Sequence, residues 1–406
     1  MLFERFVFEM RRAVKIRIYP DAAQQAQLTD QWGAVRFVWN KALHAMSHQW
    51  RVHGRSLDPK HDLKKLLKIA KASRRYGWLA EHDSMALQQA LINLGKARRA
   101  FFEKRARYPR FKSRHGRQSS YHCSGRIACG MDDSGHLKGN GWITLPKMPG
   151  RIRANIHRPI EAAWGLKSIT VTRSKTGKVF ATLLFETGEA APDLPKVIDE
   201  DAVLAGDLGL ASYMVTSRGE KIANPRHVAR AAKKVSRRQK ALSRKKKGSS
   251  NRAKARHSLA RAHEDLVNAR SDFQHKLSRA MVDESQATGL ETLRVKNMMK
   301  NRRLARAIGD AGWSAFAGQV AYKAAWSGKP HVRIDPWAPS TKLCACCGVR
   351  NDSLALKDRV WTCVCGAHHD RDINAAINIR QMAITELRAT GYSVRRGNAG
   401  TSLEAA

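Results

Sequence analysis

The first hydrophobic pattern along the chain predicts a strand followed by a long helix. Apolar residues at 14, 16 and 18 alternate with basic or aromatic residues at 15, 17 and 19, and Pro20 then ends the pattern. Asp21 stands where a helix N-cap is expected. Downstream of it, large apolar residues recur at steps of three and four, which predicts one buried helix face: Leu28, Trp32, Val35, Trp39, Leu43, Met46 and Trp50. We expect this tryptophan-rich stripe to pack in a core rather than to stack on bases.

The next patterns predict a second helix and then a sheet. Apolar residues from Leu87 to Phe101 are in helical phase, so a helix is expected over about 83–105. Residues 142–186 hold several short alternating runs, with a hairpin turn at 175–178. We expect the strand at 13–19 to join this sheet, which makes the helical stretch an insertion in a β domain.

A change of composition marks the main domain boundary. Residues 186–201 hold six acidic residues together with Pro192 and Pro195, which is typical of a linker. Beyond it, short apolar strands carry single acids at Asp207 and Glu291, and a helix precedes the second of them. The second half is therefore expected to be an α/β domain.

The charge of the chain points to a polyanionic partner. Among 406 residues, 75 are Lys or Arg and 34 are Asp or Glu, which gives a formal net charge of +41. Such a chain attracts nucleic acid, the default partner for this charge. The sequence has no run of eighteen apolar residues and no signal-peptide layout, so we expect no membrane partner and a cytoplasmic, nucleoid-associated location in a prokaryote.

Two acid-free zones are the candidate nucleic-acid contacts. Residues 104–126 interleave basic residues with Tyr108, Phe111 and Tyr121, which suits backbone contacts combined with base stacking. Residues 221–263 contain no acid either, and we expect a phosphate-tracking pair of helices there. The contact residues expected in the two zones are Arg110, Lys112, Arg237, Arg238, Arg244, Lys245, Lys246 and Lys247.

The cysteines indicate a structural zinc ribbon in a reducing compartment. Five of the seven lie between 344 and 365. Cys344 and Cys347 form a Cys-x-x-Cys pair, fifteen residues follow, and Cys363 and Cys365 form a second pair that is one residue shorter than usual. We expect these four to hold one Zn²⁺. The short pair leaves three neighbours open as the fourth ligand: Cys346, His368 and His369. Cys123 and Cys129 are expected to be ordinary packed thiols.

Three dispersed acids suggest a second metal centre. A carboxylate inside a buried strand is costly unless it is paired or binds a metal, and this applies to Asp207 and Glu291. Asp372 opens a predicted helix, where it could instead serve as the N-cap, and Asp370 competes with it. Strands and helices that carry dispersed acids suit an RNase H-like fold, in which carboxylates from several elements bind two Mg²⁺ ions.

Together these segments resemble TnpB, the RNA-guided nuclease family carried by insertion sequences and related to type V CRISPR effectors. The resemblance begins near Met10 and is carried by seven motifs, at 206–209, 291–293, 301–305, 309–313, 322–326, 339–344 and 369–376. It implies an α/β multidomain protein with a RuvC-type, RNase H-like nuclease domain, a zinc-ribbon insertion and a β-barrel-like wedge domain with a helical insertion. It also implies that Asp207, Glu291 and Asp372 are the catalytic, Mg²⁺-binding acids.

The expected domain layout follows from the same resemblance. Residues 1–20 and 104–200 would form the wedge domain and 21–103 the helical recognition insertion. Residues 201–338 and 370–385 would form the nuclease domain, 339–369 the zinc ribbon and 386–406 a disordered tail. Residues 1–9 fall outside every expected element, so Met10 is a candidate functional start.

The resemblance implies a monomer on a transposon-derived guide RNA that cuts double-stranded DNA beside a short flanking motif. Three alternatives stay open at this point: a nuclease-inactive guided repressor, a transposase that joins strands, and a passive zinc-ribbon RNA-binding protein.

Overall fold

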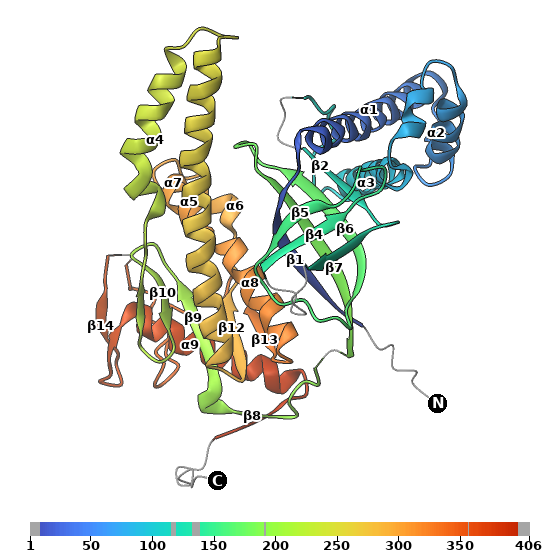
Figure 1. Ribbon diagram of the computed structural model, residues 1–406. Helices are drawn as coiled ribbons and strands as arrows, with labels where there is room; N and C mark the ends of the chain where they lie inside the picture. Colours follow the sequence, from blue (N-terminus) through green and yellow to red (C-terminus); the bar gives the residue numbers. More distant parts are fainter. Residues whose placement is uncertain (1–8, 115–118, 132–138, 191, 356, 397–406) are drawn as a thin grey trace, which may run out of the picture. The chain divides into compact units, whose positions relative to one another are not determined.

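The computed structural model describes residues 9–114, 119–131, 139–190, 192–355 and 357–396 (Figure 1). The chain divides into two compact units, residues 1–190 and 191–406. Each unit has its own sheet and is described separately below.

An antiparallel sheet of seven strands organises the first unit, in the order β2-β6-β7-β1-β5-β4-β3. The strands are β1 (Glu9–Tyr19), β2 (Ser120–Cys123), β3 (Ala128–Met131), β4 (Gly139–Thr144), β5 (Ile152–Ile156), β6 (Gly165–Arg173) and β7 (Val179–Ala190). The predicted first strand is confirmed as β1, which pairs with both β5 and β7. Within the described residues β2 and β3 remain unpaired edges, so the ladder does not close into the expected barrel.

Four helical segments lie between β1 and β2: α1 (Ala22–His53), α2 (Asp62–Ala72), the 3-10 helix η1 (Gly77–Glu81) and α3 (Ser84–Phe102). Asp21 and Asp83 cap α1 and α3, as the sequence pattern predicts for α1. The tryptophan-rich stripe is buried from Leu28 to Met46 and shares one core with the sheet, which confirms the packing interpretation; only Trp50, 60% exposed, departs from it.

The hydrophobic pattern did not predict α2, β2 or β3. Helix α2 spans only 11 residues and buries only Leu63 and Leu67. Strand β2 lies inside the basic zone at 104–126, for which no strand was predicted. Short elements with few apolar positions give a weak periodic signal.

A mixed sheet of five strands organises the second unit, in the order β11-β10-β9-β12-β13. The strands are β9 (Val203–Leu208), β10 (Ser212–Thr216), β11 (Lys221–Ala223), β12 (Ala287–Glu291) and β13 (His331–Ile334). Strands β9, β12 and β13 run parallel, whereas β10 and β11 are antiparallel additions at the β9 side. The second unit therefore has the expected α/β class.

Helices cover both faces of this sheet (Figure 1). On one face, α5 (Ser250–Asp283), α7 (Ala305–Ala311) and α8 (Trp313–Trp326) pack against the side chains of Leu204 and Leu290. On the other, α9 (Arg371–Ala389) packs against Val203 and Ala205. The expected pair of basic helices is present as α4 (His227–Ser243) and α5. The remaining short elements are η2 (Glu200–Ala202), α6 (Val295–Met298), β14 (Val360–Thr362) and β15 (His368–Asp370).

The expectation of a disordered tail over 386–406 is wrong for its first part. Helix α9 continues to Ala389, and β16 (Ser393–Arg395) pairs in parallel with β8 (Val197–Asp199), inside the expected linker. Val394 and Ile198 are buried in the α9-side core, which explains why these three-residue strands form. Residues 397–406 lie outside the described residues.

None of the helices in the described ranges combines the length and the apolar composition that a membrane span requires.

Candidate metal centres

The strand alternation brings Asp207 and Glu291 to the same face of the second sheet. In β9, Val203 and Ala205 face α9, so Asp207 faces α9 too. In β12, Ala287 faces α9, and Glu291, four residues further along the strand, faces α9 as well. The two acids lie one residue beyond the paired Gly206 and Leu290, on adjacent parallel strands. Register alone therefore places these two carboxyl groups side by side.

Two glycines make this arrangement possible. A Cβ at Gly206 would stand 2.5 Å from the Met214 sulfur, and a Cβ at Gly289 would stand 2.9 Å from Cβ of Ala383 in α9. The second glycine lets α9 approach the sheet closely beside Glu291.

The third acid comes from the start of α9. Asp370 is the N-cap: its side chain accepts from the backbone N–H groups of Asp372 and Ile373, and it forms an ion pair with Lys221 at 2.6 Å. Asp372 is thereby free of the capping role and lies in the first helical turn, half-buried. Its Oδ1 is 3.5 Å from Nη1 of Arg359.

The Asp207 carboxyl group interacts with both of the other carboxyl groups. Burial, and next the negative charge of Asp372, raise the pKa of Asp207 to about 6. Burial, and next the charge of Asp207, raise the pKa of Glu291 to about 8. The two side chains share a hydrogen bond, and the backbone N–H of Leu208 donates to Glu291 Oε1 at 3.1 Å. Adjacent carboxylates that hold protons well above pH 4 are suited to a divalent cation, which would replace the protons.

The acid cluster is looser than the cysteine cluster. Among the described residues, sets of three or more potential metal ligands with all donor atoms within 4.8 Å occur only at the cysteines. Two ions about 4 Å apart need a wider spread of ligands than one ion does, so this looseness is compatible with a two-ion centre.

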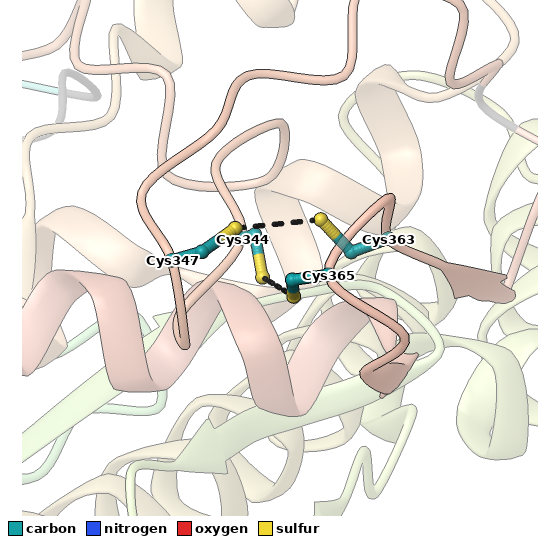
Figure 2. A group of neighbouring side chains, drawn as sticks. All are labelled: Cys344, Cys347, Cys363 and Cys365. Carbon is teal, nitrogen blue, oxygen red and sulfur yellow. Dashed lines mark hydrogen bonds between the residues drawn. The ribbon is translucent and has the colours of Figure 1, made fainter.

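The four expected zinc ligands converge in the ribbon. The sulfurs of Cys344, Cys347, Cys363 and Cys365 lie within 4.8 Å of one another. Figure 2 shows the two pairs facing each other, with sulfur separations of 3.5 Å for Cys347–Cys363 and 3.8 Å for Cys344–Cys365. Four thiolates at these distances suit one tetrahedral Zn²⁺.

The three neighbours left open by the sequence take different positions. His368 points to Thr362, with Nδ1 2.8 Å from Oγ1. His369 is buried against the Trp361 ring and brings Nε2 within 3.0 Å of the Cys344 sulfur. Cys346, with Cys344 and His369, makes a second compact set. Burial opposes ionisation of Cys344, yet N–H groups of Cys347 and Cys346, together with His369, lower its pKa to about 5.

Amide side chains of α9 hold the first cysteine turn. Asn374 accepts from the Ala345 N–H at 2.9 Å and donates to the Leu343 carbonyl at 2.7 Å. Asn378 donates to the carbonyls of Ser340 and Leu343, and Gln381 to that of Ala345. We call Asn374, Asn378 and Gln381 the amide clamp. The helix that begins beside Asp372 thus also holds the ribbon in place.

The expected nucleic-acid residues in α4 and directly after its end divide into two groups. Arg237, Arg244 and Lys245–Lys247 are exposed. A hollow of about 640 Å³ on this helix is lined by five basic residues, Lys233, Arg237, Lys240, Arg244 and Arg306. Arg238 instead donates to Ser258 Oγ and joins α4 to α5.

The expected residues of the first unit divide in the same way. Arg110 is exposed, whereas Lys112 is half-buried with Nζ 3.8 Å from the Trp39 ring centre. The Asn40 side chain donates to the Lys112 carbonyl and accepts from the Lys112 N–H. Tyr121 was expected to stack on bases, but its side chain is buried in the core, so that prediction is wrong for Tyr121. Cys123 is buried and Cys129 half-buried, which confirms packed thiols.

Sequence reasoning did not single out Arg359, Lys221 or the amide clamp. The clamp had a readable signal, because polar residues at 374 and 378 interrupt the apolar face that α9 turns inward. Arg359 and Lys221 had none, since only the folded ribbon and β11 bring them to the acids.

Comparisons with known proteins match most of the chain. Residues 186–302 match the OrfB_IS605 family model, described as "Probable transposase", and residues 313–379 match the Cas12f1-like TNB domain. Residues 10–55 match a model described as a helix-turn-helix domain. The structure has a strand and one long helix there, β1 and α1.

Relatives and a solved structure cover nearly the whole chain. A protein of Streptomyces pristinaespiralis, described as "Putative RNA-guided DNA endonuclease", is 40% identical over 91% of this chain and 89% of its own length. InsQ of Escherichia coli K12, described in the same words, is 29% identical over 91% of both chains. The fold is similar to that of Cas12f1 in a complex with sgRNA and target DNA, with a TM-score of 0.57, 12% identity, and coverage of 91% of this chain and 98% of that one. On this evidence the chain belongs to the insertion-sequence OrfB/TnpB family, in which the relatives described as RNA-guided DNA endonucleases fall.

Proposed function

We propose that the chain is an RNA-guided DNA endonuclease of a transposable element, and that it hydrolyses DNA phosphodiesters at Asp207, Glu291 and Asp372. The observation that carries the proposal is the convergence of these acids, from two adjacent strands and the start of α9, on one face of one sheet. Their oxygen donors and raised pKa values fit Mg²⁺.

The protein groups have distinct tasks in this proposal. Two Mg²⁺ ions, when bound, would supply the activation of water and the neutralisation of charge at the leaving oxygen. Asp207 and Glu291, fixed by strand register and by the Leu208 N–H, would hold them from the sheet. Asp372 would hold them from α9, where Asp370 and Lys221 fix the helix start. Zn²⁺ on Cys344, Cys347, Cys363 and Cys365 would be structural. The set of four converging sulfurs includes Cys365 and not His369, which supports Cys365 as the fourth ligand.

The charge of the chain supports the partners. A net charge of +41 and the basic hollow on α4 suit a guide RNA and a DNA target, with base pairing choosing the sequence. The expected domain ranges, action as a monomer and association with the nucleoid belong to the same proposal.

The test begins with the RNA that co-purifies with the protein. We expect that RNA to end in a segment that can be replaced, and the replaced segment to redirect Mg²⁺-dependent cleavage of a DNA plasmid. Asp207→Asn should abolish cleavage. The matched control is Asp201→Asn, an exposed acid that pairs with Arg380 at 2.9 Å. Cleavage that ignores the replaced segment would refute the guided function.

A second candidate is DNA strand transfer, which the description of the 186–302 family favours. The same reaction separates the two, because strand transfer joins a transposon end to the target, whereas hydrolysis leaves free ends.

A further inference from the structure

The seven-stranded sheet has a second face that carries arginines and aromatic rings. In β1, Val14, Ile16 and Ile18 are buried in the core, so the odd-numbered residues, among them Arg17 and Tyr19, point to the other face. The pairing places Phe180 of β7 opposite Arg17, and Arg153 of β5 opposite Tyr19.

Cations and rings alternate across these strands. The Arg17 guanidinium lies 5.2 Å from the Phe180 ring centre and 5.4 Å from that of Tyr19. Arg153 lies 5.4 Å from the Tyr19 ring on the neighbouring strand. Tyr19 nevertheless remains 41% exposed, so its ring is available to a further flat partner.

These residues border a built hollow of about 650 Å³, which we call the Tyr19 hollow. It is lined by Arg17, Tyr19, Pro20, Asp21, Gln24, Arg151 and Arg153, among others. The buried Gln24 donates from Nε2 to the carbonyls of Pro149 and Arg151, at 3.0 and 3.1 Å, and its N–H binds Asp21. The start of α1 is thereby tied to the segment that carries Arg151, and the walls are fixed before any ligand enters.

The charge in the Tyr19 hollow is unbalanced. Within the part of the chain that the structure describes, Arg17, Arg151 and Arg153 take part in no ion pair. Arg17 also keeps a buried Nη1 without a hydrogen-bond partner. Asp21 is engaged as the cap of α1. The Arg17 and Arg153 guanidinium groups lie against the exposed Tyr19 ring, and Arg151 lines the same hollow with its guanidinium 4.0 Å from the Trp142 ring centre. Two guanidinium groups beside an exposed ring match a phosphate group attached to a planar base.

We propose that the Tyr19 hollow binds one unpaired nucleotide of a single RNA strand, with its base on Tyr19 and its phosphate between Arg17 and Arg153. The inference rests on the proposed function, in which the chain carries a guide RNA. The volume lies in the usual range for a ligand pocket, and unpaired bases that stack on aromatic side chains are the usual targets of RNA recognition.

The experiment measures the affinity of the full chain, freed of co-purified RNA, for a fluorescent single-stranded oligouridylate and for a DNA duplex. Stacking contributes roughly 5- to 100-fold per base, so Tyr19→Ala should weaken RNA binding by about that factor, and Tyr19→Phe should restore it. Arg17→Gln and Arg153→Gln should each lower the salt slope by roughly 0.7. Trp50→Ala is the control, because Trp50 is exposed but lies about 40 Å along α1 from Asp21.

A second readout locates the nucleotide. Oligouridylate substituted with 4-thiouridine should crosslink under ultraviolet light to the peptide that contains Tyr19. RNA affinity of Tyr19→Ala equal to that of Trp50→Ala, with no such crosslink, would overturn the site. If Tyr19→Ala weakened binding of the DNA duplex and left RNA binding unchanged, the Tyr19 hollow would be a DNA site, and the proposal would also be overturned. Either result would leave the proposed function intact, because the wild type could still cleave DNA with a guide. If the wild type bound no RNA, the proposed function itself would be refuted.

Discussion

The cysteine cluster and the acid cluster are built in opposite ways. The four cysteines come from two short turns within 22 residues, and their sulfurs lie within 4.8 Å of one another. The three acids come from two strands and a helix separated by more than 160 residues, and they are held by the fold of the whole second unit. The first cluster follows from local turn geometry, whereas the second follows from strand register and helix packing.

The difference predicts how each cluster fails. A ligand lost from the cysteine cluster removes an ion that folds the ribbon. A ligand lost from the acid cluster leaves the sheet intact, since β9 and β12 are held by apolar cores on both faces. Mutations should therefore separate stability from activity.

The largest effect is expected on cleavage when one acid is neutralised. Asp372→Asn should lower the cleavage rate more than about 100-fold, because removing even a group that only orients a metal ligand costs roughly 10- to 100-fold. Guide RNA affinity and the melting temperature should stay near the wild-type values. Single-turnover cleavage with titrated Mg²⁺ measures the effect, and an active Asp372→Asn would show that α9 supplies no ligand.

The next effect is the loss of zinc. Cys344→Ser should reduce bound zinc from one equivalent to a small fraction and unfold the ribbon, since its sulfur contacts both Cys365 and His369. Cys346→Ser is the matched control and should keep its zinc, as measured by elemental analysis. Zinc lost from Cys346→Ser would transfer the site to the alternative set with His369.

A smaller effect should connect the two clusters. Asn374→Ala removes two hydrogen bonds of the amide clamp and should speed zinc release to a chelator by roughly 10-fold, as loss of outer partners of a metal site does. Gln381→Ala removes one bond from an exposed residue and should change the rate less. Equal rates in both variants and the wild type would show that the clusters are independent.

A separate effect on stability concerns pH in Mg²⁺-free protein. The folded chain holds protons on Asp207 to about pH 6 and on Glu291 to about pH 8, whereas unfolded carboxyls release them near pH 4. The folded state therefore binds more protons, and the free energy of unfolding should fall between about pH 4 and pH 8, by at most about 1.4 kcal/mol per pH unit for each retained proton. The melting temperature of the wild type should therefore decrease over this pH range. In Glu291→Gln it should decrease less. A wild-type melting temperature that rises over this range would contradict the sign.

The sequence predicted what local patterns encode. The cysteine spacing identified all four converging thiols, and alternation identified β1 with its capped helix α1. It could not choose between Asp370 and Asp372 from the residues alone, because both stand at a helix start; the hydrogen bonds of Asp370 assign it the cap. The amide clamp and the surroundings of the exposed Tyr19 depend on contacts between residues at least 29 positions apart, which no short pattern carries.

The amide clamp has a consequence for any attempt to shorten this protein. The ribbon leaves the second unit after β13 and returns at Asp370, so it looks like a removable appendage. Yet Asn374, Asn378 and Gln381 would face solvent without it, and the turn that carries Asp372 would lose its neighbours Arg359 and Ala355. A shorter variant made by deleting the ribbon would therefore need replacement partners for these three amides before the turn that carries Asp372 could re-form.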